Sequence, residues 1–338
     1  MDKNSQENGQ KILVIGGAGA IGRYLLKKLI SHYGSQQIIA ALRRTSLSND
    51  LSSSVICEYG FDLCNEESIR LLFEKYRGQI SSVWNLAAPL SIDTAKDPNV
   101  AYDITVNGMR RLLECMKEYQ VTSLFFSDSI GSYGITAPRE NCSSIWLAEN
   151  PNQDPGSDYG IQKRFCRNLL HEYSANHNFD NRFVIIPGVL HLEPTWAGGT
   201  TEYALDAIKA AIEGEPYISP VSFDTKLPMI HVDDLVNGMV SLMHAPVERF
   251  EGERAKCRGV CLAGFSFTPQ ELFDVIRQEY PGFIVSYCPE VSPHVTRFSI
   301  TWPDSLDPIE AKEIINFESR KSFEETIREI IQAHRSRI

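Results

Sequence analysis

The feature that most constrains this chain is a glycine-rich turn between an apolar strand and a helix. Residues 11–16 (KILVIG) form an almost uninterrupted apolar run, as expected for a strand buried on both faces of a parallel sheet. The turn GGAGAIG follows at once, and apolar residues then recur at helical spacing over 21–32. A strand, a tight glycine turn and a helix in this order predict the opening unit of a parallel α/β fold.

Three glycines in this turn are spaced by three residues, at Gly16, Gly19 and Gly22. One permits the tight turn, one lets the backbone approach a pyrophosphate, and one lets the helix pack against the strand. The unpaired N–H groups at the start of the helix then face the negative phosphates. We therefore expect a dinucleotide to contact Gly16, Gly19, Ala20, Ile21 and Gly22.

Strands and helices alternate through the first half of the chain. Further strands are predicted at 38–42, 55–59, 83–86, 123–127 and 182–186, with helices at 65–76, 98–119 and 158–177. This alternation predicts an α/β fold with a Rossmann doubly wound parallel sheet and right-handed crossovers.

Beyond Pro187 the alternation weakens, and a helix is expected near 201–213. A strand at 229–232 and a helix at 233–244 are expected to return to the main sheet. We predict a flexible tail at 1–10, a dinucleotide-binding domain at 11–186 and 229–263, and a smaller interleaved substrate-binding lobe at 187–228 and 264–328.

The composition of the chain argues against some classes of binding partner. The 338 residues carry a net charge of -10, which argues against non-specific nucleic-acid binding because that binding needs basic surface. No apolar stretch approaches the roughly 20 residues that span a bilayer. The start, MDKNSQENGQ, lacks the apolar core of a signal peptide. These patterns favour a soluble intracellular protein, with cytoplasm and mitochondrial matrix not distinguished.

Eight cysteines are scattered along the chain. The closest pair in its second half, Cys257 and Cys261, has no histidine cluster nearby. This spacing favours reduced thiols, with neither a disulfide framework nor a metal site.

A serine, a tyrosine and a lysine are spaced for alcohol oxidation. Tyr159 and Lys163 lie four residues apart in a predicted helix and so share a face, and Ser129 lies at the end of a predicted strand. A free tyrosine has a pKa of about 10, and a base near neutral pH needs a value near 7, or roughly 4 kcal/mol of differential stabilisation. A nearby ammonium and a positive nicotinamide ring provide much of that, while the serine holds the substrate hydroxyl.

The residues expected near the adenosine end of the dinucleotide give conflicting indications about which cofactor binds. A ribose-binding acid is expected at the end of the second strand, but Leu42 stands there, and Arg43 and Arg44 follow. Two arginines suit the 2′-phosphate of NADP. Asp62, after the third strand, is either a turn residue or an acceptor for the adenine amino group. The small residues of NLAAP, with Leu86, Ala87, Ala88 and Pro89, are expected beneath the nicotinamide ribose.

With these motifs in hand, the chain resembles the extended short-chain dehydrogenase/reductases, the group that includes UDP-galactose epimerases. The cues are GGAGAIG, FDL (61–63), NLAAP (85–89), Asn107, Ser129, YGIQK and the Pro187-Gly188 pair. Three later segments, AGGTTEYALDA (197–207), DTKLPMIHVDDL (224–235) and ITWPDSLDPIEA (300–311), are similar to the short-chain type of L-threonine 3-dehydrogenase. The resemblance covers residues 11–328.

The resemblance implies NAD-dependent oxidation of the L-threonine hydroxyl to 2-amino-3-oxobutyrate, without zinc, by a homodimer formed through the helices at 98–119 and 158–177. It also implies NAD rather than NADP, so it conflicts with the two arginines, and NADP stays open. Leu63, Asn107 and Pro187 join the cofactor site. Gly199, Thr200 and Thr201 would hold the threonine carboxylate, and Trp302 would close the pocket.

Several simpler interpretations stay open. The segment GGTT is also a helix start with a threonine N-cap, and Trp302 is also a core residue. His231 and Asp233 are interpreted as a strand residue and a helix cap. Asp128 departs from the family pattern, which often has serine or threonine there, and residues 138–155 are expected to form an active-site loop. The alternative functions are a nucleotide-sugar epimerase or dehydratase that retains NAD, and a non-catalytic dinucleotide-binding protein.

Overall fold

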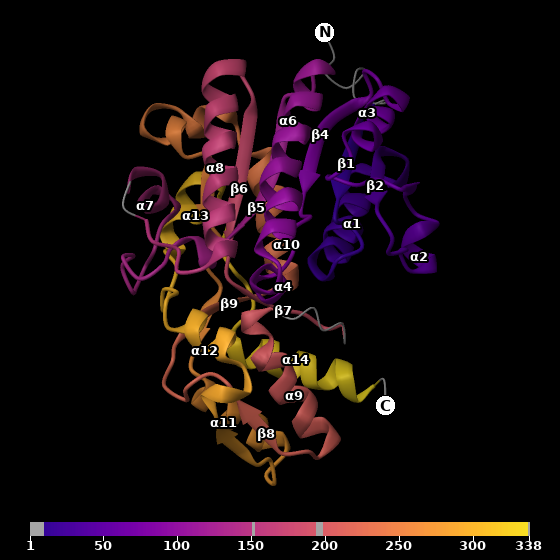
Figure 1. The fold of residues 1–338 in the computed structure, drawn as a ribbon. Helices are drawn as coiled ribbons and strands as arrows, with labels where there is room; N and C mark the ends of the chain where they lie inside the picture. Colours follow the sequence, from indigo (N-terminus) through magenta and orange to yellow (C-terminus); the bar gives the residue numbers. More distant parts are fainter. Residues whose placement is uncertain (1–9, 151–152, 194–198, 337–338) are drawn as a thin grey trace.

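A seven-stranded parallel sheet forms the centre of the molecule (Figure 1). The computed structural model describes residues 10–150, 153–193 and 199–336. Within them the strand order is β10-β6-β5-β4-β1-β2-β3. The bounds are β1 Lys11–Ile15, β2 Ile38–Leu42, β3 Ile56–Tyr59, β4 Ile80–Asn85, β5 Ser123–Ser129, β6 Asp180–Ile186 and β10 Gly259–Cys261. The predicted Rossmann-type α/β fold is confirmed.

Helices cover both faces of this sheet. On one face α1 (Ala20–Tyr33) and α10 (Val232–His244) pack together, and Leu25, Leu26 and Leu29 of α1 are fully buried. On the other face lie α3 (Glu66–Lys75), α6 (Gly108–Glu118) and α8 (Asp158–His177). All five residues of β2 (IIAAL) are buried. This agrees with the prediction from its continuous apolar run, which is typical of a sheet covered on both faces.

The helix predicted at 98–119 contains an irregular turn. It consists of α5 (Pro98–Tyr102), a π-helical turn at Asp103–Asn107, and α6. Asp97 caps α5 by accepting a hydrogen bond from the Val100 N–H, and Pro98 takes the first helical position, where no N–H is needed. The π-helical turn has no periodic signal in the sequence.

The strand near Met229 does not join the main sheet, so that expectation is wrong. β9 (Leu227–His231) pairs with β7 (Gly188–Leu190) and β11 (Phe265–Phe267) in a separate three-stranded sheet. Pro187, between β6 and β7, has no N–H to continue the ladder, and the chain changes sheets there. The seventh strand is instead β10, which pairs with β6. A side chain at Gly259 would come within 2.3 Å of the Phe183 ring, so β10 needs glycine at this point.

The remaining elements gather below the main sheet in Figure 1. They are α9 (Tyr203–Glu213), α11 (Pro269–Glu279), α12 (Pro293–Ser299), α14 (Phe323–Arg335) and a two-stranded sheet of β8 (Tyr217–Ser219) and β12 (Val285–Tyr287). α13 (Pro308–Ile315) packs against β10 instead. The division of the chain into a dinucleotide-binding domain and a substrate lobe stays a prediction.

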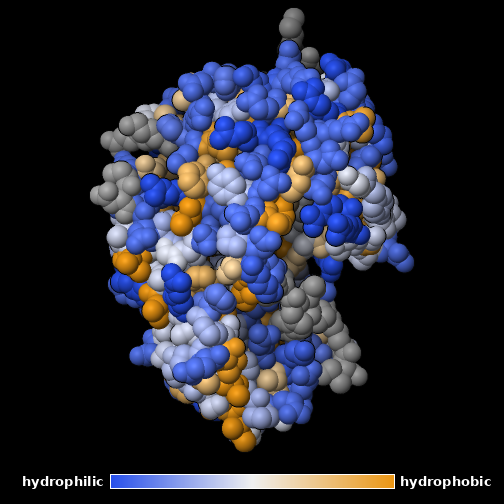
Figure 2. Space-filling model, in the orientation of Figure 1, coloured by the Kyte–Doolittle hydropathy of each residue, from blue (hydrophilic) through white to orange (hydrophobic). Residues whose placement is uncertain are grey.

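The surface in the view of Figure 2 is largely hydrophilic, with apolar side chains in separate patches. Among the described residues no helix has both the length and the apolar character needed to cross a bilayer.

Candidate active site

Two adjoining cavities lie where the strands of the main sheet end. The larger, of about 640 Å³, is lined by Arg43, Asp62 and Ala87, and the smaller, of about 320 Å³, by Ser129, Tyr159 and Trp302. Both are lined by the same five residues at their junction, namely Gly16, Gly19, Leu86, Ala88 and Pro89. The two cavities therefore form one cleft that passes over the glycine turn.

The glycine turn has the geometry of a phosphate cradle. Gly16 has φ +84°, and a side chain on it would meet the Ala87 backbone nitrogen at 2.9 Å. A side chain on Gly22 would come within 2.3 Å of the Gly16 carbonyl oxygen. No side chain caps α1 at Gly19, so the first N–H groups of this helix are left for a ligand. The residues present fit a dinucleotide pyrophosphate.

On the adenosine side Asp62 has a turn role of its own. Its Oδ1 accepts a hydrogen bond from the Cys64 N–H at 3.0 Å. Its Oδ2 lies 3.9 Å from Nη1 of Arg43, whose side chain is half exposed. Asp62, Leu63, Arg43 and Arg44 all line the larger cavity. The arginines therefore face the cleft, with Asp62 as a counter-charge to the first of them.

The segment after β4 is fixed by its own asparagine. Asn85 is buried, and its Oδ1 accepts a hydrogen bond from the Ala87 N–H at 3.1 Å. Leu86, Ala87, Ala88 and Pro89 then line the cleft. Asn107 lines neither cavity, and its amide donates to Asp103 inside the π-helical turn. Pro187 lines the smaller cavity.

Ser129, Tyr159 and Lys163 are brought together at one wall of the smaller cavity. Ser157 caps α8 through the Gly160 N–H and so starts the helix that carries Tyr159 and Lys163. The buried Lys163 Nζ donates to the Ser127 carbonyl at 2.6 Å and lies 5.4 Å from the centre of the Tyr159 ring. The strand end that bears Ser129 thus also anchors the lysine.

Asp128 is held by partners of its own. It is buried, and its Oδ1 accepts from the Ser129 N–H at 2.8 Å and from the Ser132 hydroxyl at 2.6 Å. Its Oδ2 forms a buried ion pair with Arg167 at 2.5 Å. The negative charge of Asp128, a residue that departs from the family pattern, is therefore balanced by Arg167. The same carboxylate fixes the backbone of Ser129.

The remaining predicted residues line the same cavity. Gly199, Thr200, Thr201 and Trp302 all line the smaller cavity, and Trp302 is only 5% exposed. The Thr200 hydroxyl lies 3.0 Å from the Ser91 hydroxyl. The alternative of a threonine N-cap is wrong, because Thr200–Glu202 form a 3-10 turn and no side chain caps α9.

Ser91, Glu202 and His191 also line the cavity, and none of these three was predicted from the sequence. Ser91 begins α4 (Ser91–Lys96), and its place two residues after NLAAP was an available signal. Glu202 follows the two threonines of GGTT. His191 follows β7, and burial lowers its pKa. For His191 no motif in the sequence pointed to the cavity.

The segment that carries Trp302 is bound along its length to residues 139–144. Arg139 Nη1 donates to the carbonyl oxygens of Ile300 and Trp302, and its Nη2 pairs with Asp304. Cys142 then forms an isolated parallel bridge with Leu306. The cavity wall at Trp302 is thus positioned by contacts on the side away from the cavity.

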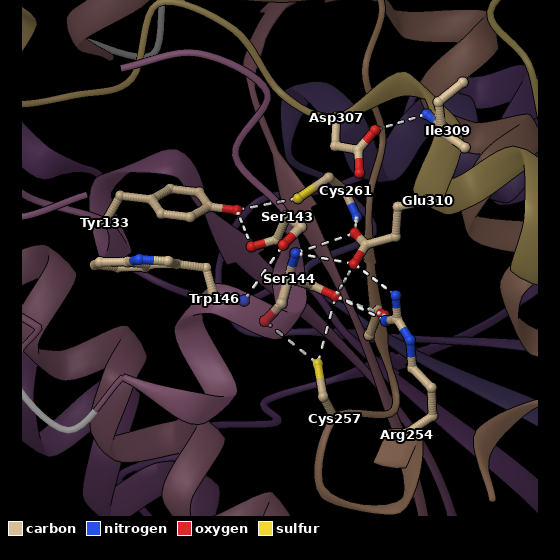
Figure 3. A network of polar contacts seen from close by, with 11 residues as sticks. Tyr133, Ser143, Ser144, Trp146, Arg254, Cys257, Cys261, Asp307, Ile309 and Glu310 are labelled. Carbon is tan, nitrogen blue, oxygen red and sulfur yellow. Dashed lines mark hydrogen bonds and ion pairs between the residues drawn. The ribbon is translucent and has the colours of Figure 1, made fainter. Parts of the chain in front are cut away.

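A buried carboxylate, Glu310, completes this attachment (Figure 3). It accepts from the Ser144 N–H at 3.0 Å, from the Cys261 N–H at 2.7 Å and from Arg254 Nη2 at 2.8 Å. Its side chain is 1% exposed. Glu310 therefore ties together α7 (Ser144–Glu149), β10 and α13. Burial of the Cys261 thiol, and then the charge of Glu310, raise the pKa of that thiol.

Two further expectations are corrected. Residues 138–155 were expected to form an active-site loop, but they contain the helix α7, and Asp154 forms an isolated bridge with Gly134. Residues 151–152 of this segment lie outside the described part of the chain. The N-cap of α10 is His231, whose Nδ1 accepts from the Asp233 N–H at 3.1 Å, so Asp233 is not the cap. Within the described residues no group of three or more potential ligands is arranged to hold a metal ion.

Similarity to known proteins agrees with this geometry. An uncharacterized epimerase/dehydratase from Staphylococcus haemolyticus is 28% identical over 301 residues, which cover 88% of this chain and 89% of the relative. The solved structure of L-threonine dehydrogenase from Clostridium difficile has a TM-score of 0.86 at 27% identity, covering 97% of this chain and 98% of that one. A monomeric L-threonine 3-dehydrogenase from a metagenome has a TM-score of 0.85 at 27% identity, covering 97% and 100%.

The family model that matches is described as the NAD dependent epimerase/dehydratase family, and the match spans residues 12–256. Together with the extended short-chain dehydrogenase motifs and the parallel sheet, this match identifies the chain as a member of the NAD dependent epimerase/dehydratase family.

Proposed function

We propose that this chain oxidises the side-chain hydroxyl of L-threonine to the ketone of 2-amino-3-oxobutyrate, with NAD as the hydride acceptor. The observation that carries the proposal is the smaller cavity. Ser129, Tyr159 and Lys163 line it together with two threonines and a tryptophan.

The proposed chemistry divides among three side chains. When NAD is bound, its nicotinamide ring supplies an acceptor for the hydride that leaves the threonine β-carbon. The ammonium of Lys163, fixed by the Ser127 carbonyl, stabilises the phenolate form of Tyr159, and the phenolate oxygen takes the hydroxyl proton and becomes a phenol. Ser129 donates a hydrogen bond to the oxygen that becomes the ketone.

The cavity wall supports a small zwitterionic substrate. The hydroxyls of Thr200 and Thr201 are suited to the carboxylate. Glu202 follows the two threonines and lines the same cavity, and we assign its carboxylate to the substrate ammonium. Trp302 closes the pocket over the methyl group.

A nucleotide-sugar epimerase is the second candidate, since the family includes such enzymes. A diphosphate needs several cationic side chains. Lys163 is the only lysine or arginine among the described residues that line the smaller cavity, and it is committed to Ser127. This observation favours the amino acid over the nucleotide sugar. A non-catalytic role is disfavoured because Ser129, Tyr159 and Lys163 all share one cavity.

We assign NAD rather than NADP because the family is NAD dependent and because Asp62 offsets the charge of Arg43. We also propose a homodimer through α5 and α8. These helices expose Val100, Tyr102, Ile161 and Phe165, and the last three are 38 to 45% exposed. The mass in solution measures this proposal, and a monomer would contradict it.

Initial rates test the proposed function, followed as NADH or NADPH formation with L-threonine and as sugar product with a UDP-sugar. The arms are L-threonine with NAD, L-threonine with NADP, and a UDP-sugar with NAD retained. We expect turnover in the first arm and at least a tenfold lower rate with NADP. Turnover of the UDP-sugar without threonine-dependent NADH would contradict the proposal.

A further inference from the structure

A third cavity, of about 200 Å³, lies apart from the active-site cleft, between α7, α8 and the start of β6. Figure 1 shows α7 beside α8 on this side of the molecule. Three arginines and a histidine line it, namely Arg164, Arg167, His171 and Arg258. Among its described lining residues there is no aspartate or glutamate. A polar cavity with this lining attracts an anion.

Two buried polar atoms in this lining have no hydrogen-bond partner. One is the Arg258 Nε, a donor, and the other is the Asn181 Oδ1, an acceptor. Asn181 is only 3% exposed. Its amide orientation is fixed because Nδ2 donates to the Leu170 carbonyl at 2.9 Å and to Ser174 at 3.2 Å. A group that fits must therefore both accept from arginine and donate to Asn181.

Two arginines of the lining are paired with carboxylates outside it, and one of these carboxylates is shared between two arginines. Arg167 is paired with Asp128, but Arg258 shares Asp180 with Arg182. Arg164 Nη1 donates to the Gln153 carbonyl at 3.0 Å.

We propose that this cavity binds a protonated oxyanion, with inorganic phosphate as the simplest example. Phosphate near neutral pH has charged oxygens for the arginines and at least one O–H, which donates to Asn181 Oδ1. Sulfate and carboxylates have the charge but lack this donor.

The cavity is connected to the active site through Arg167. Arg167 Nη2 donates to the Gln153 side chain at 2.7 Å, while its Nη1 holds Asp128, which in turn fixes the Ser129 N–H. An anion at Arg167 therefore bears on the strand end that carries Ser129. Binding is expected to slow amide exchange across 127–133.

Calorimetric titration of the full chain with phosphate tests the proposal, at constant ionic strength set with chloride. NAD is kept saturating so that the glycine turn does not take up phosphate. We expect one phosphate per chain and at least about tenfold weaker binding of sulfate, which lacks the donor.

Two variants place the site. Arg258→Met should weaken phosphate binding by about tenfold or more, because it removes a charged donor. Arg164→Met is the second variant if the first does not fold, and Arg43→Met, in the dinucleotide cleft, is the matched control. Absence of phosphate binding would overturn the proposal, as would loss of binding in Arg43→Met with Arg258→Met unchanged. Equal binding of sulfate and phosphate would overturn the role of Asn181.

Discussion

Replacing Glu310 tests whether the buried carboxylate in Figure 3 holds three elements together. In Glu310→Ala, Nη2 of Arg254 and the N–H groups of Ser144 and Cys261 lose this acceptor, while Nη1 of Arg254 keeps the Ser144 hydroxyl and the Gly259 carbonyl as acceptors. In Glu310→Gln, one amide oxygen still accepts, but the amide nitrogen faces groups that also donate. Both changes leave buried donors unpaired.

The magnitude follows from burial. Breaking a buried ion pair costs about 3–5 kcal/mol, because the remaining charge stays desolvated. Arg254 is 19% exposed and gains some water, so we expect about 3 kcal/mol for Glu310→Gln and about 4 kcal/mol for Glu310→Ala. The entropy of unfolding is ~2.1 cal/mol/K per residue, taken over 338 residues. Dividing a loss of about 3 kcal/mol in unfolding free energy by this entropy gives a Tm decrease of roughly 4 °C.

Calorimetric melting of the purified chain measures this effect. Glu313→Gln is the matched control, because Glu313 is exposed on the same helix and should leave the Tm unchanged. If Glu310→Gln lowers the Tm no more than the control does, the network is not what holds α7, β10 and α13 together.

Three further predictions concern single positions. Tyr159→Phe should lower threonine-dependent NADH formation by about 100-fold or more, because the proton acceptor is removed, and a loss below about tenfold would exclude Tyr159 as the base. Gly22→Ala should weaken NAD binding by at least about tenfold, since the new methyl group would meet the Gly16 carbonyl. Gly282→Ala, whose methyl group would lie in open space, is the control for the same NAD titration. Burial lowers the pKa of His231, so as the pH falls this histidine is protonated in the unfolded chain before it is protonated in the folded one. The free energy of unfolding should therefore decrease as the pH drops below about 6.5. Chemical unfolding at about pH 7.5 and 5.5 should show a smaller decrease in His231→Asn than in the unchanged chain, and equal decreases in the two proteins would contradict this role.

The parts of the structure that follow from local patterns were predictable. The buried run at β1, the glycine turn and the helical period of α1 fix the first unit of the sheet, and the same alternation gives the next strands. Ser129 was assigned to a strand end and Tyr159 to a helix face because those placements depend on a few neighbouring residues. The structure has both, and the roles assigned to them remain proposals.

The parts that failed depend on contacts between distant residues. β10 has only three residues (GVC), too few for a periodic signal, and its place beside β6 depends on glycine facing the Phe183 ring. Neither the buried ion pair of Asp128 with Arg167, 39 residues apart, nor the Glu310 contacts with Ser144, 166 residues apart, has a sequence pattern. These contacts decide how the cavity walls are held.

The central claim is that hydride passes from the threonine β-carbon to NAD in the cavity of Tyr159. The most direct measurement uses L-threonine carrying deuterium on that carbon and follows the label by mass spectrometry of the NADH formed. We predict that the deuterium is recovered in NADH and that its transfer depends on Tyr159. NADH formed without deuterium, or no threonine-dependent NADH from the folded chain, would contradict the claim.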